Sequence, residues 1–341
     1  MTDLSAINAF AKSVRPAVRE ELEKAIARAG DHSTPALLEM ITYQLGWSGE
    51  DCGTKAEGKQ LRALFCLLAC QAAGGVWQDA LPAAAAVELI HNFSLIHDDI
   101  EDNSYFRRGR PTVWKIWGQA QAINTGDAMF ALANASLLNL SQSVSPEVAL
   151  KAGKRFHATC LRLTQGQHLD IAFENQNQVE LETYFQMAAG KTAALLAYCL
   201  EVGALCARPD PQIQAHYHDF GHFLGLAFQV QDDILGIWGD EERTGKSTIG
   251  DLITRKKTLP VLYGLSQNKS FQAEWMSGDM TPEKAVRLGD LLEAEGGLAY
   301  AQSEADRLTG QALTALQNAQ PQGEAGEILE ETARQLLSRS V

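Results

Sequence analysis

The chain has 341 residues, of which 45% are hydrophobic, so it can bury a large core. Its formal net charge of −13 argues against nucleic acid or an anionic membrane as a general partner, because both repel an acidic surface. Six scattered cysteines without a Cys-x-x-Cys pair are typical of reduced thiols in the cytoplasm rather than of a disulfide framework.

The N-terminal segment contains acids and lacks the apolar core of a signal peptide. The longest apolar runs, residues 63–70 and 193–200, are far shorter than the ~18 residues that a membrane span requires. We therefore expect a cytoplasmic protein without a membrane span.

Helix-forming residues dominate the whole chain, and the alternation typical of strands is nearly absent. We predict helices at 4–30, 34–45, 58–75, 81–103, 125–142, 146–174, 179–206, 211–238, 254–268, 281–295, 297–318 and 324–339. Loops are expected at 46–55, 107–114, 208–211, 239–251 and 277–281. No linker is long enough to divide the chain. The sequence therefore predicts an all-α protein in which residues 1–341 form a single domain.

Four acids stand at the end of an apolar helix: Asp98, Asp99, Glu101 and Asp102. On a helix, residues four apart share one face, so Asp98 and Asp102 lie about one turn apart. Like charges at this spacing destabilise a helix, and the C-terminus of a helix is unfavourable for anions, so a cation must compensate. A solvated helix end with surplus acids is the alternative.

Three arginines at positions 107, 108 and 110 follow these acids on a loop that contains Gly and Pro. Carboxylates are ligands for Mg²⁺, and guanidinium groups bind phosphate oxygens in pairs. This combination favours a site for a metal–diphosphate complex over a solvated helix end.

A second Asp pair, Asp232-Asp233, again follows an apolar helical stretch. If its helix faces the first across a bundle, the two sets of acids border one cavity. Nearby, His218 and His222 have the helical spacing of zinc ligands, but they lack the Glu of the metalloprotease motif. We interpret this His pair as structural.

Together these motifs resemble those of the trans-isoprenyl diphosphate synthases, the polyprenyl synthetase family. Residues 98–102 resemble its first aspartate-rich motif, Arg107-Arg108-Gly109 the arginine pair that follows, and Asp232-Asp233 the start of the second motif. The resemblance extends from about residue 58 to residue 260 with the motifs in order. It implies the isoprenoid synthase fold, which is a large helical bundle around a central cavity. It also implies a homodimer with three Mg²⁺ ions per active site.

The resemblance assigns roles to single residues as well. The isopentenyl diphosphate site would contain Lys59, Arg62, His91 and Arg108, and the allylic diphosphate site Arg107, Lys246 and Lys257. Catalytic or substrate-binding positions near the reacting carbon would be Lys191, Thr192 and Gln229, together with Asp98 and Asp102. The metal ligands would be Asp98, Asp99, Asp102, Asp170, Asp232 and Asp233, and Gln167 belongs to the same element as Asp170.

Three positions depart from the family pattern. Gln60 stands where many members have a further Arg, and Trp114 stands where many have His. Gly236 replaces the last acid of the second motif, so this side of the site offers two adjacent carboxylates rather than three. A water molecule could complete the coordination there, because Mg²⁺ retains water readily.

The resemblance implies a head-to-tail prenyltransferase that condenses an allylic diphosphate with isopentenyl diphosphate. A class I terpene cyclase would carry an N-D-x-x-S-x-x-x-E motif, which residues 232–240 do not match. A head-to-head synthase would lack the Arg-Arg-Gly and Gly-Lys-x-x-Arg elements. A non-catalytic partner subunit stays open, although such subunits typically lose acids that are complete here.

Product length is expected to depend on Phe93 and Ser94, which precede Asp98 by five and four residues. In the family, bulky residues at these positions form the floor of the channel in which the product grows. One large and one small residue favour a short product, C20 geranylgeranyl diphosphate first and C15 farnesyl diphosphate second. A longer polyprenyl product is the alternative, and Phe93 could also be a simple core aromatic residue.

Overall fold

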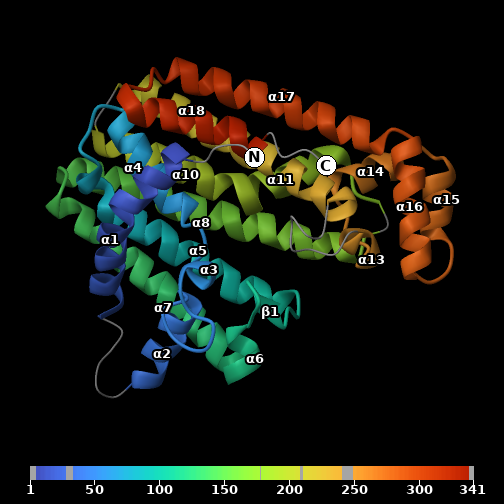
Figure 1. Cartoon of the computed structure of the whole chain (residues 1–341), viewed down its shortest axis with the longest axis horizontal. Coiled ribbons are helices and arrows are strands. Elements are labelled where there is room, and N and C mark those ends of the chain that lie inside the picture. Colours follow the sequence, from blue (N-terminus) through green and yellow to red (C-terminus); the bar gives the residue numbers. More distant parts are fainter. Residues whose placement is uncertain (1–4, 28–33, 177, 208–209, 240–248, 338–341) are drawn as a thin grey trace.

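The computed structural model describes residues 5–27, 34–176, 178–207, 210–239 and 249–337. Most of these residues are helical (Figure 1). The first half contains α1 (Ser5–Ile26), α2 (Pro35–Gln44), α3 (Thr54–Glu57), α4 (Leu61–Ala72), α5 (Leu81–Glu101), α6 (Val113–Trp117), α7 (Gln119–Leu138) and α8 (Pro146–Glu174). The only strands in the described ranges are β1 (Phe106–Arg107) and β2 (Arg110–Pro111), which pair antiparallel.

The second half continues with α9 (Leu181–Ala188), a π-helical turn (Ala189–Ala193), α10 (Ala194–Ala207), α11 (Pro211–Trp238) and α13 (Gly250–Ile253). It ends with α14 (Leu259–Ser266), α15 (Ser270–Met276), α16 (Pro282–Ala294), α17 (Gly297–Asn318) and α18 (Gly323–Leu337). Short 3₁₀ turns lie at Trp77–Ala80 and Asn139–Gln142. The all-α prediction is therefore confirmed.

Local capping explains the helices whose predicted bounds are confirmed. The helix at 146–174 begins with Pro146 at its first position, and the Ser145 side chain accepts a hydrogen bond from the Val148 amide. The helix at 211–238 begins in the same way with Pro211, and the Asp210 side chain accepts from the Gln212 amide. The first turn of a helix leaves backbone N–H groups without partners. Proline at the first position removes one such group, and the capping side chain accepts a hydrogen bond from another.

Other predicted bounds are wrong because tertiary contacts interrupt the helical pattern. The segment predicted as one helix over 179–206 is divided by the π-helical turn. The helix predicted over 254–268 begins only at Leu259, because Arg255 has a left-handed backbone with φ 56°. Helices α6 and α15 were not predicted as helices, since both are shorter than two turns.

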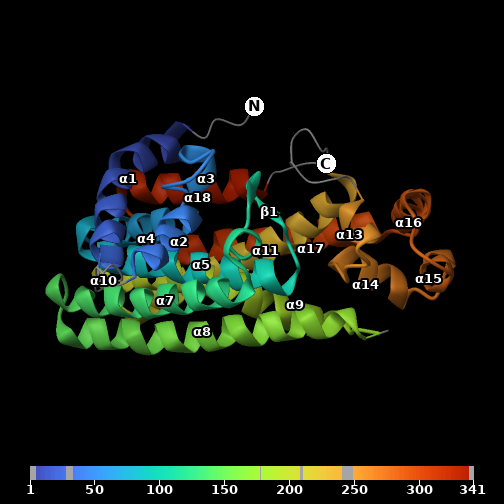
Figure 2. The same cartoon turned by 90° about the horizontal axis from the view of Figure 1, so that it is seen from below.

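Helix α5 lies inside the bundle and contacts α4, α7 and α10. Its first three turns are almost completely buried, because alanines at positions 83–86 let neighbouring helices approach closely. Figure 2 shows α7 and α8 lying side by side along the lower edge of the molecule, while α15 and α16 lie together at its right-hand end. The acidic end of α5 reaches solvent at Glu101 and Asp102.

One described helical segment, Leu181–Ala207, is apolar and long enough to cross a membrane. Of its most apolar window, 78% is buried inside the protein. The segment therefore serves as a core element of the bundle, and its hydrophobicity is explained by its burial.

Candidate active site

The acids of α5 and α8 meet at one lysine. The Lys191 ammonium donates a hydrogen bond of 2.5 Å to Asp170 Oδ2 and lies 3.3 Å from Asp98 Oδ1. The Gln167 amide nitrogen donates to Glu101 Oε2 over 2.7 Å and lies 3.5 Å from Asp98 Oδ1. Residues that the sequence separates by more than ninety positions thus share one cluster.

Two glycines bring the π-helical turn against α8 so that Lys191 reaches the acids. A Cβ on Gly166 would lie 2.1 Å from the Lys191 amide nitrogen, and a Cβ on Gly190 would lie 2.7 Å from the Arg162 carbonyl oxygen. Any side chain at either position would push the two backbones apart. On the same turn, the Thr192 hydroxyl donates to Gln229 Oε1 of α11 over 2.5 Å, so these two predicted residues also meet.

The Asp99 carboxylate forms an ion pair with Arg107. Its side chain is only 2% exposed, and its Oδ1 accepts a 2.7 Å hydrogen bond from Arg107 Nε. The Arg107 Nη2 donates to Asp98 Oδ2 over 2.9 Å. Burial raises the pKa of Asp99 to about 6, although Arg107 opposes this shift. Asp99 therefore orients Arg107, and metal binding by Asp99 stays a prediction.

Both carboxylate oxygens of Asp233 accept hydrogen bonds from the protein itself. Its Oδ2 accepts hydrogen bonds from the Tyr184 hydroxyl over 2.7 Å and from the Leu259 amide over 2.9 Å, and its Oδ1 accepts from the Gln229 amide over 2.9 Å. Burial raises its pKa to about 6 despite these donors. With both oxygens occupied, Asp233 anchors α9, α11 and α14 to one another. Metal binding by Asp233 and by Asp232 stays a prediction.

Lys256 is a further lysine close to the acids, next to Lys257 in the sequence. Burial lowers the pKa of Lys256, whereas the carboxylates of Asp233, Asp251 and Asp170 raise it. The carboxylates outweigh burial, so the net shift of the pKa is upward. Lys257 instead donates to the Phe173 carbonyl oxygen over 2.6 Å. The sequence alone did not distinguish these adjacent lysines, because the left-handed turn at 255 decides which one faces the acids.

Lys246, the other lysine predicted to bind the allylic diphosphate, lies outside the described residues.

A second cationic group lies about two turns before Asp98 along α5. Arg62 Nη1 is 3.2 Å from His91 Nε2, and Arg108 Nη1 donates to the Ala56 carbonyl oxygen over 2.7 Å. Burial, together with Arg62 and Arg108, holds the pKa of His91 well below its ordinary value, so this His is neutral and can accept a hydrogen bond from Arg62. Lys59 is exposed nearby, in the loop before α4.

Glu88 is a functional candidate that our sequence reading did not identify. It lies one turn before His91 on α5 and is 4% exposed. Burial raises its pKa, while Arg62 and Arg108 lower it. A buried acid within an alanine-rich helix was the available signal, because buried carboxylates are rare unless cations compensate for them.

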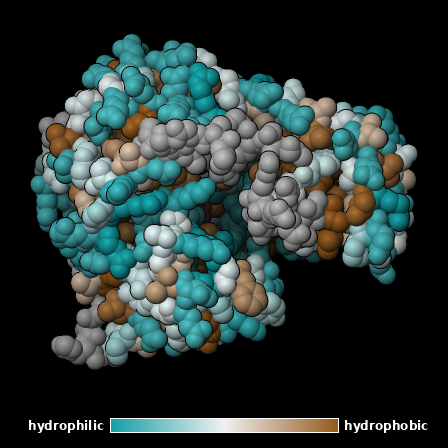
Figure 3. Space-filling model, viewed as in Figure 1, coloured by the Kyte–Doolittle hydropathy of each residue, from teal (hydrophilic) through white to brown (hydrophobic). Residues whose placement is uncertain are grey.

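Two cavities adjoin the acids. One of about 410 Å³ is lined by residues that include Arg62, His91, Phe93, Asp98 and Lys191. The other, of about 710 Å³, is lined by Asp102, Asp170, Phe173, Lys256 and Lys257, among others. Figure 3 shows a recess in this mostly hydrophilic face of the molecule, between the lower lobe that contains α6 and the right-hand part that contains α13. Asp98 and Asp102 thus face two compartments, one partly apolar and one rich in charge.

The apolar end of the smaller cavity contains a stack of rings. The Phe93 ring centroid is 4.7 Å from that of His97 and 5.3 Å from that of Phe130 on α7. Gly126 leaves room for this stack, because a Cβ there would lie 2.3 Å from His97 Nε2. Ser94 turns its hydroxyl back to the His91 carbonyl oxygen over 2.8 Å.

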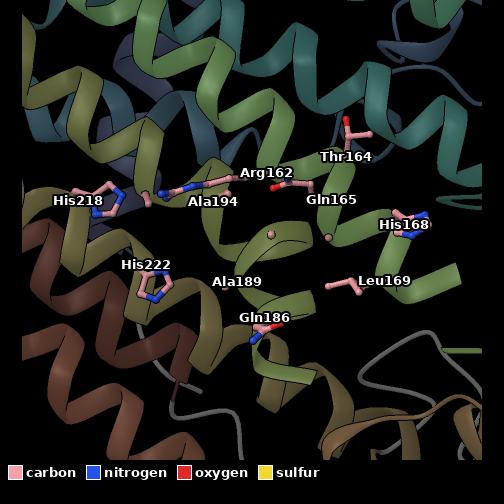
Figure 4. A pocket seen from close by; sticks show the side chains of 13 residues that line it. Arg162, Thr164, Gln165, His168, Leu169, Gln186, Ala189, Ala194, His218 and His222 are labelled. Atoms are coloured by element: carbon pink, nitrogen blue, oxygen red, sulfur yellow. The ribbon is translucent and has the colours of Figure 1, made fainter. Parts of the chain in front are cut away.

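A third cavity, of about 740 Å³, lies away from these acids behind the π-helical turn (Figure 4). Arg162, His218 and His222 line it, and the two His rings stack with centroids 6.4 Å apart. No carboxylate lines it among the described residues. The acidic partner of the pair is Asp219, whose Oδ1 lies 3.3 Å from His218 Nδ1.

The carboxylates of the acidic cluster fit a Mg²⁺ ion whose coordination shell is completed by oxygen atoms of the substrate. Burial and the Asp98 carboxylate raise the pKa of Asp102 to about 6, which is the electrostatic cost of bringing these acids together. Within the described ranges, no three His, Cys, Asp or Glu side chains form a ready-made metal site. Mg²⁺ commonly binds one or two carboxylates and completes its shell with water and phosphate oxygens.

Comparison with known proteins agrees with this geometry. The sequence profile described as polyprenyl synthetase matches residues 51–289. The chain is 41% identical over 315 residues to a geranylgeranyl diphosphate synthase from Mycobacterium tuberculosis, with 90% of this chain and 89% of that protein covered. It is 39% identical over 309 residues to a (2E,6E)-farnesyl diphosphate synthase from Mycobacterium bovis, with 86% and 84% covered.

The fold has a close structural counterpart in the crystal structure of a polyprenyl synthetase from Streptomyces coelicolor. The two share a TM-score of 0.86 and 33% sequence identity, and the match covers 98% of this chain and 99% of that one. Sequence and fold thus agree over nearly the whole length, including every described helix that carries the acidic cluster. The chain belongs to the polyprenyl synthetase family.

Proposed function

We propose that the protein is a short-chain prenyltransferase that joins an allylic diphosphate head-to-tail to isopentenyl diphosphate. The observation that carries this proposal is the position of Lys191, which bridges Asp98 and Asp170 between two separate groups of cations. The geranylgeranyl and farnesyl diphosphate synthases among its relatives support the same chemistry.

The allylic diphosphate would bind in the larger, charged cavity. When its C–O bond breaks, negative charge develops on the departing diphosphate, and Lys191, Lys256 and Arg107 are already held in place to stabilise that charge. Bound Mg²⁺, three ions by analogy with the family, would add Lewis-acid stabilisation of the same leaving group. Asp98, Asp102, Asp170 and Asp232 are the carboxylates proposed to hold these ions.

Isopentenyl diphosphate would bind at Lys59, Arg62, His91 and Arg108, with its double bond directed at the allylic carbon. Thr192 lines the smaller cavity, and its hydroxyl is fixed by Gln229, so its oxygen lone pairs are oriented near the developing allylic cation. A new C–C bond forms, a proton is lost to the released diphosphate, and the product is five carbons longer. Glu88 would balance the buried charge of Arg62 and Arg108 between turnovers.

Incubation of the purified chain with Mg²⁺, labelled isopentenyl diphosphate and C5, C10 or C15 allylic primers tests the proposal. Chromatography of the products gives both the preferred primer and the product length. Turnover by this chain alone would exclude a non-catalytic partner subunit, and a complete lack of turnover would support one.

Magnesium together with inorganic pyrophosphate is expected to stabilise the fold. A ligand at 100 times its dissociation constant adds about 2.7 kcal/mol to the free energy of unfolding, which raises the melting temperature by a few degrees in a large domain. Thermal unfolding followed by circular dichroism, with and without excess chelator, measures this shift. An equal shift in an Asp98→Ala variant would contradict the assigned ligands.

Product length is proposed to be C20, with C15 as the second choice, and to depend on the ring of Phe93. Replacing Phe93 by alanine opens the end of the cavity, so products should lengthen by one or more C5 units while turnover persists. If Phe93 were only a core residue, its loss would cost about 3–5 kcal/mol of stability without altering the product. Thin-layer chromatography of dephosphorylated products, combined with thermal unfolding, distinguishes the two outcomes.

A cytoplasmic homodimer with a single domain over residues 1–341 completes the proposal. Helices α7 and α8 present apolar side chains to solvent, including Ile123 at 46%, Leu138 at 75% and Leu161 at 60% exposure. An exposed apolar face of this kind is typical of a surface that a second subunit covers. Phe10, Leu61 and Phe223 each pack against two of the hydrophobic cores, which supports one continuous domain.

A further inference from the structure

The N-terminal helix α1 contacts the loop that carries Lys59. Val14 and Val18 of this helix are almost completely buried in the main hydrophobic core, which fixes α1 on the bundle. Arg15 and Arg19 follow these two positions and lie one turn apart, so they share one face of the helix. This face is directed toward the residues between α2 and α4.

Each of the two arginines contacts a different part of this loop. Arg15 Nη2 donates a 3.2 Å hydrogen bond to the Lys59 carbonyl oxygen. Arg19 Nη1 donates to Glu57 Oε1 over 3.3 Å, and its guanidinium carbon lies 3.5 Å from the ring centroid of Trp47. Helix α1 thus holds the loop at two positions that are only two residues apart.

Arg108 packs against the same loop. Its Nη1 donates to the Ala56 carbonyl oxygen over 2.7 Å. A Cβ on Gly58 would lie 2.7 Å from Arg108 Cζ, so only glycine allows the guanidinium group to lie against the backbone there. A shift of residues 56–59 would therefore displace Arg108 and Lys59 together.

The loop has little regular structure of its own. Helix α3 is a single turn of four residues, and the backbone has positive φ at Gly53, Gly58 and Gln60. Ordering such a segment costs conformational entropy, which contacts from other parts of the chain must offset. The two arginines of α1 provide contacts of this kind.

We infer that Arg15 and Arg19 are positioning residues of the isopentenyl diphosphate site. They hold residues 57–59 so that Lys59 and Arg108 bind one diphosphate together, and neither of them contacts the substrate itself. The inference rests on the proposed function and adds the N-terminal helix to a site whose proposed ligands begin at position 59. Among the described residues, none from α1 or from this loop lines the larger cavity, so the allylic site should be unaffected.

Steady-state kinetics of an Arg15→Met variant tests the inference, because methionine keeps an unbranched side chain and removes the donors. The KM for isopentenyl diphosphate is expected to rise about 3- to 10-fold, while kcat and the allylic KM stay within about twofold. Arg15→Lys keeps a donor and should recover most of the lost affinity. Lys12→Met, at an exposed position on the same helix, is the matched control and should leave all three constants unchanged.

A double-mutant cycle tests Arg19 through its ion pair. Arg19→Gln and Glu57→Gln each remove one charge, and each should raise the KM for isopentenyl diphosphate about threefold. Because both substitutions break the same pair, the double variant should also show about a threefold increase, rather than the roughly ninefold increase of two independent effects.

Three results would overturn the inference: an unchanged KM for isopentenyl diphosphate in Arg15→Met, independent effects in the Arg19–Glu57 cycle, or equal increases in both KM values. A role of α1 in stability alone would lower the melting temperature and leave the ratio of the two KM values unchanged. Failure of the proposed function is recognised separately, since the parent protein would then neither turn over nor bind isopentenyl diphosphate in titration calorimetry.

Discussion

Replacing Asp98 or Asp102 by alanine is expected to lower turnover by about three orders of magnitude, which corresponds to roughly 4 kcal/mol in the activation barrier. The physical reason is that the two carboxylates lie one turn apart at the end of α5 and face both cavities. Without either of them, the leaving diphosphate loses part of the positive charge that would stabilise it in the transition state.

Steady-state rates with saturating substrates and Mg²⁺ measure this effect, and far-ultraviolet circular dichroism verifies the fold. Asp306→Ala, an exposed acid on α17, is the control and should retain full activity. If either active-site variant kept more than about a tenth of the parent rate, a loss below ~1.4 kcal/mol, the metal-binding assignment would be wrong.

The second large effect should separate the two substrates. Lys256→Ala is expected to raise the KM for the allylic diphosphate about 10- to 150-fold, because a charge-assisted hydrogen bond contributes roughly 1.5–3 kcal/mol. Arg62→Ala and His91→Ala should raise the KM for isopentenyl diphosphate instead, since these side chains contact each other and line the smaller cavity but not the larger one. Initial rates measured with one substrate varied and the other saturating give both constants.

Lys257→Ala is the matched control for Lys256, because the two lysines are adjacent but point to different partners. Its ammonium is bound to the carbonyl oxygen at the end of α8, so its removal should change the allylic KM by less than about threefold. Equal increases in the allylic KM for Lys256→Ala and Lys257→Ala would show that the turn at 255 does not determine which lysine binds the substrate. Equal increases in both KM values for every variant would contradict two separate diphosphate sites.

The sequence by itself determined the helices whose ends are specified locally. Prolines and capping side chains at 145–146 and 210–211 define where α8 and α11 begin, and these signals lie next to the helix start in the sequence. The first acidic motif was recognisable for the same reason: Asp98 and Asp102 lie on one helix, and the distance between them follows from helical geometry alone.

The tertiary structure decided which chemically similar residues do which task. Whether Lys256 or Lys257 faces the acids depends on a left-handed turn, and whether Asp233 is a ligand or an anchor depends on Tyr184 and the Leu259 amide, which come from other helices. Asp251 occupies the space beside Gly236 only because α13 packs against α11. Local sequence specifies φ, ψ and helix faces over a few residues, whereas the direction of a charged side chain results from packing between segments far apart in the chain.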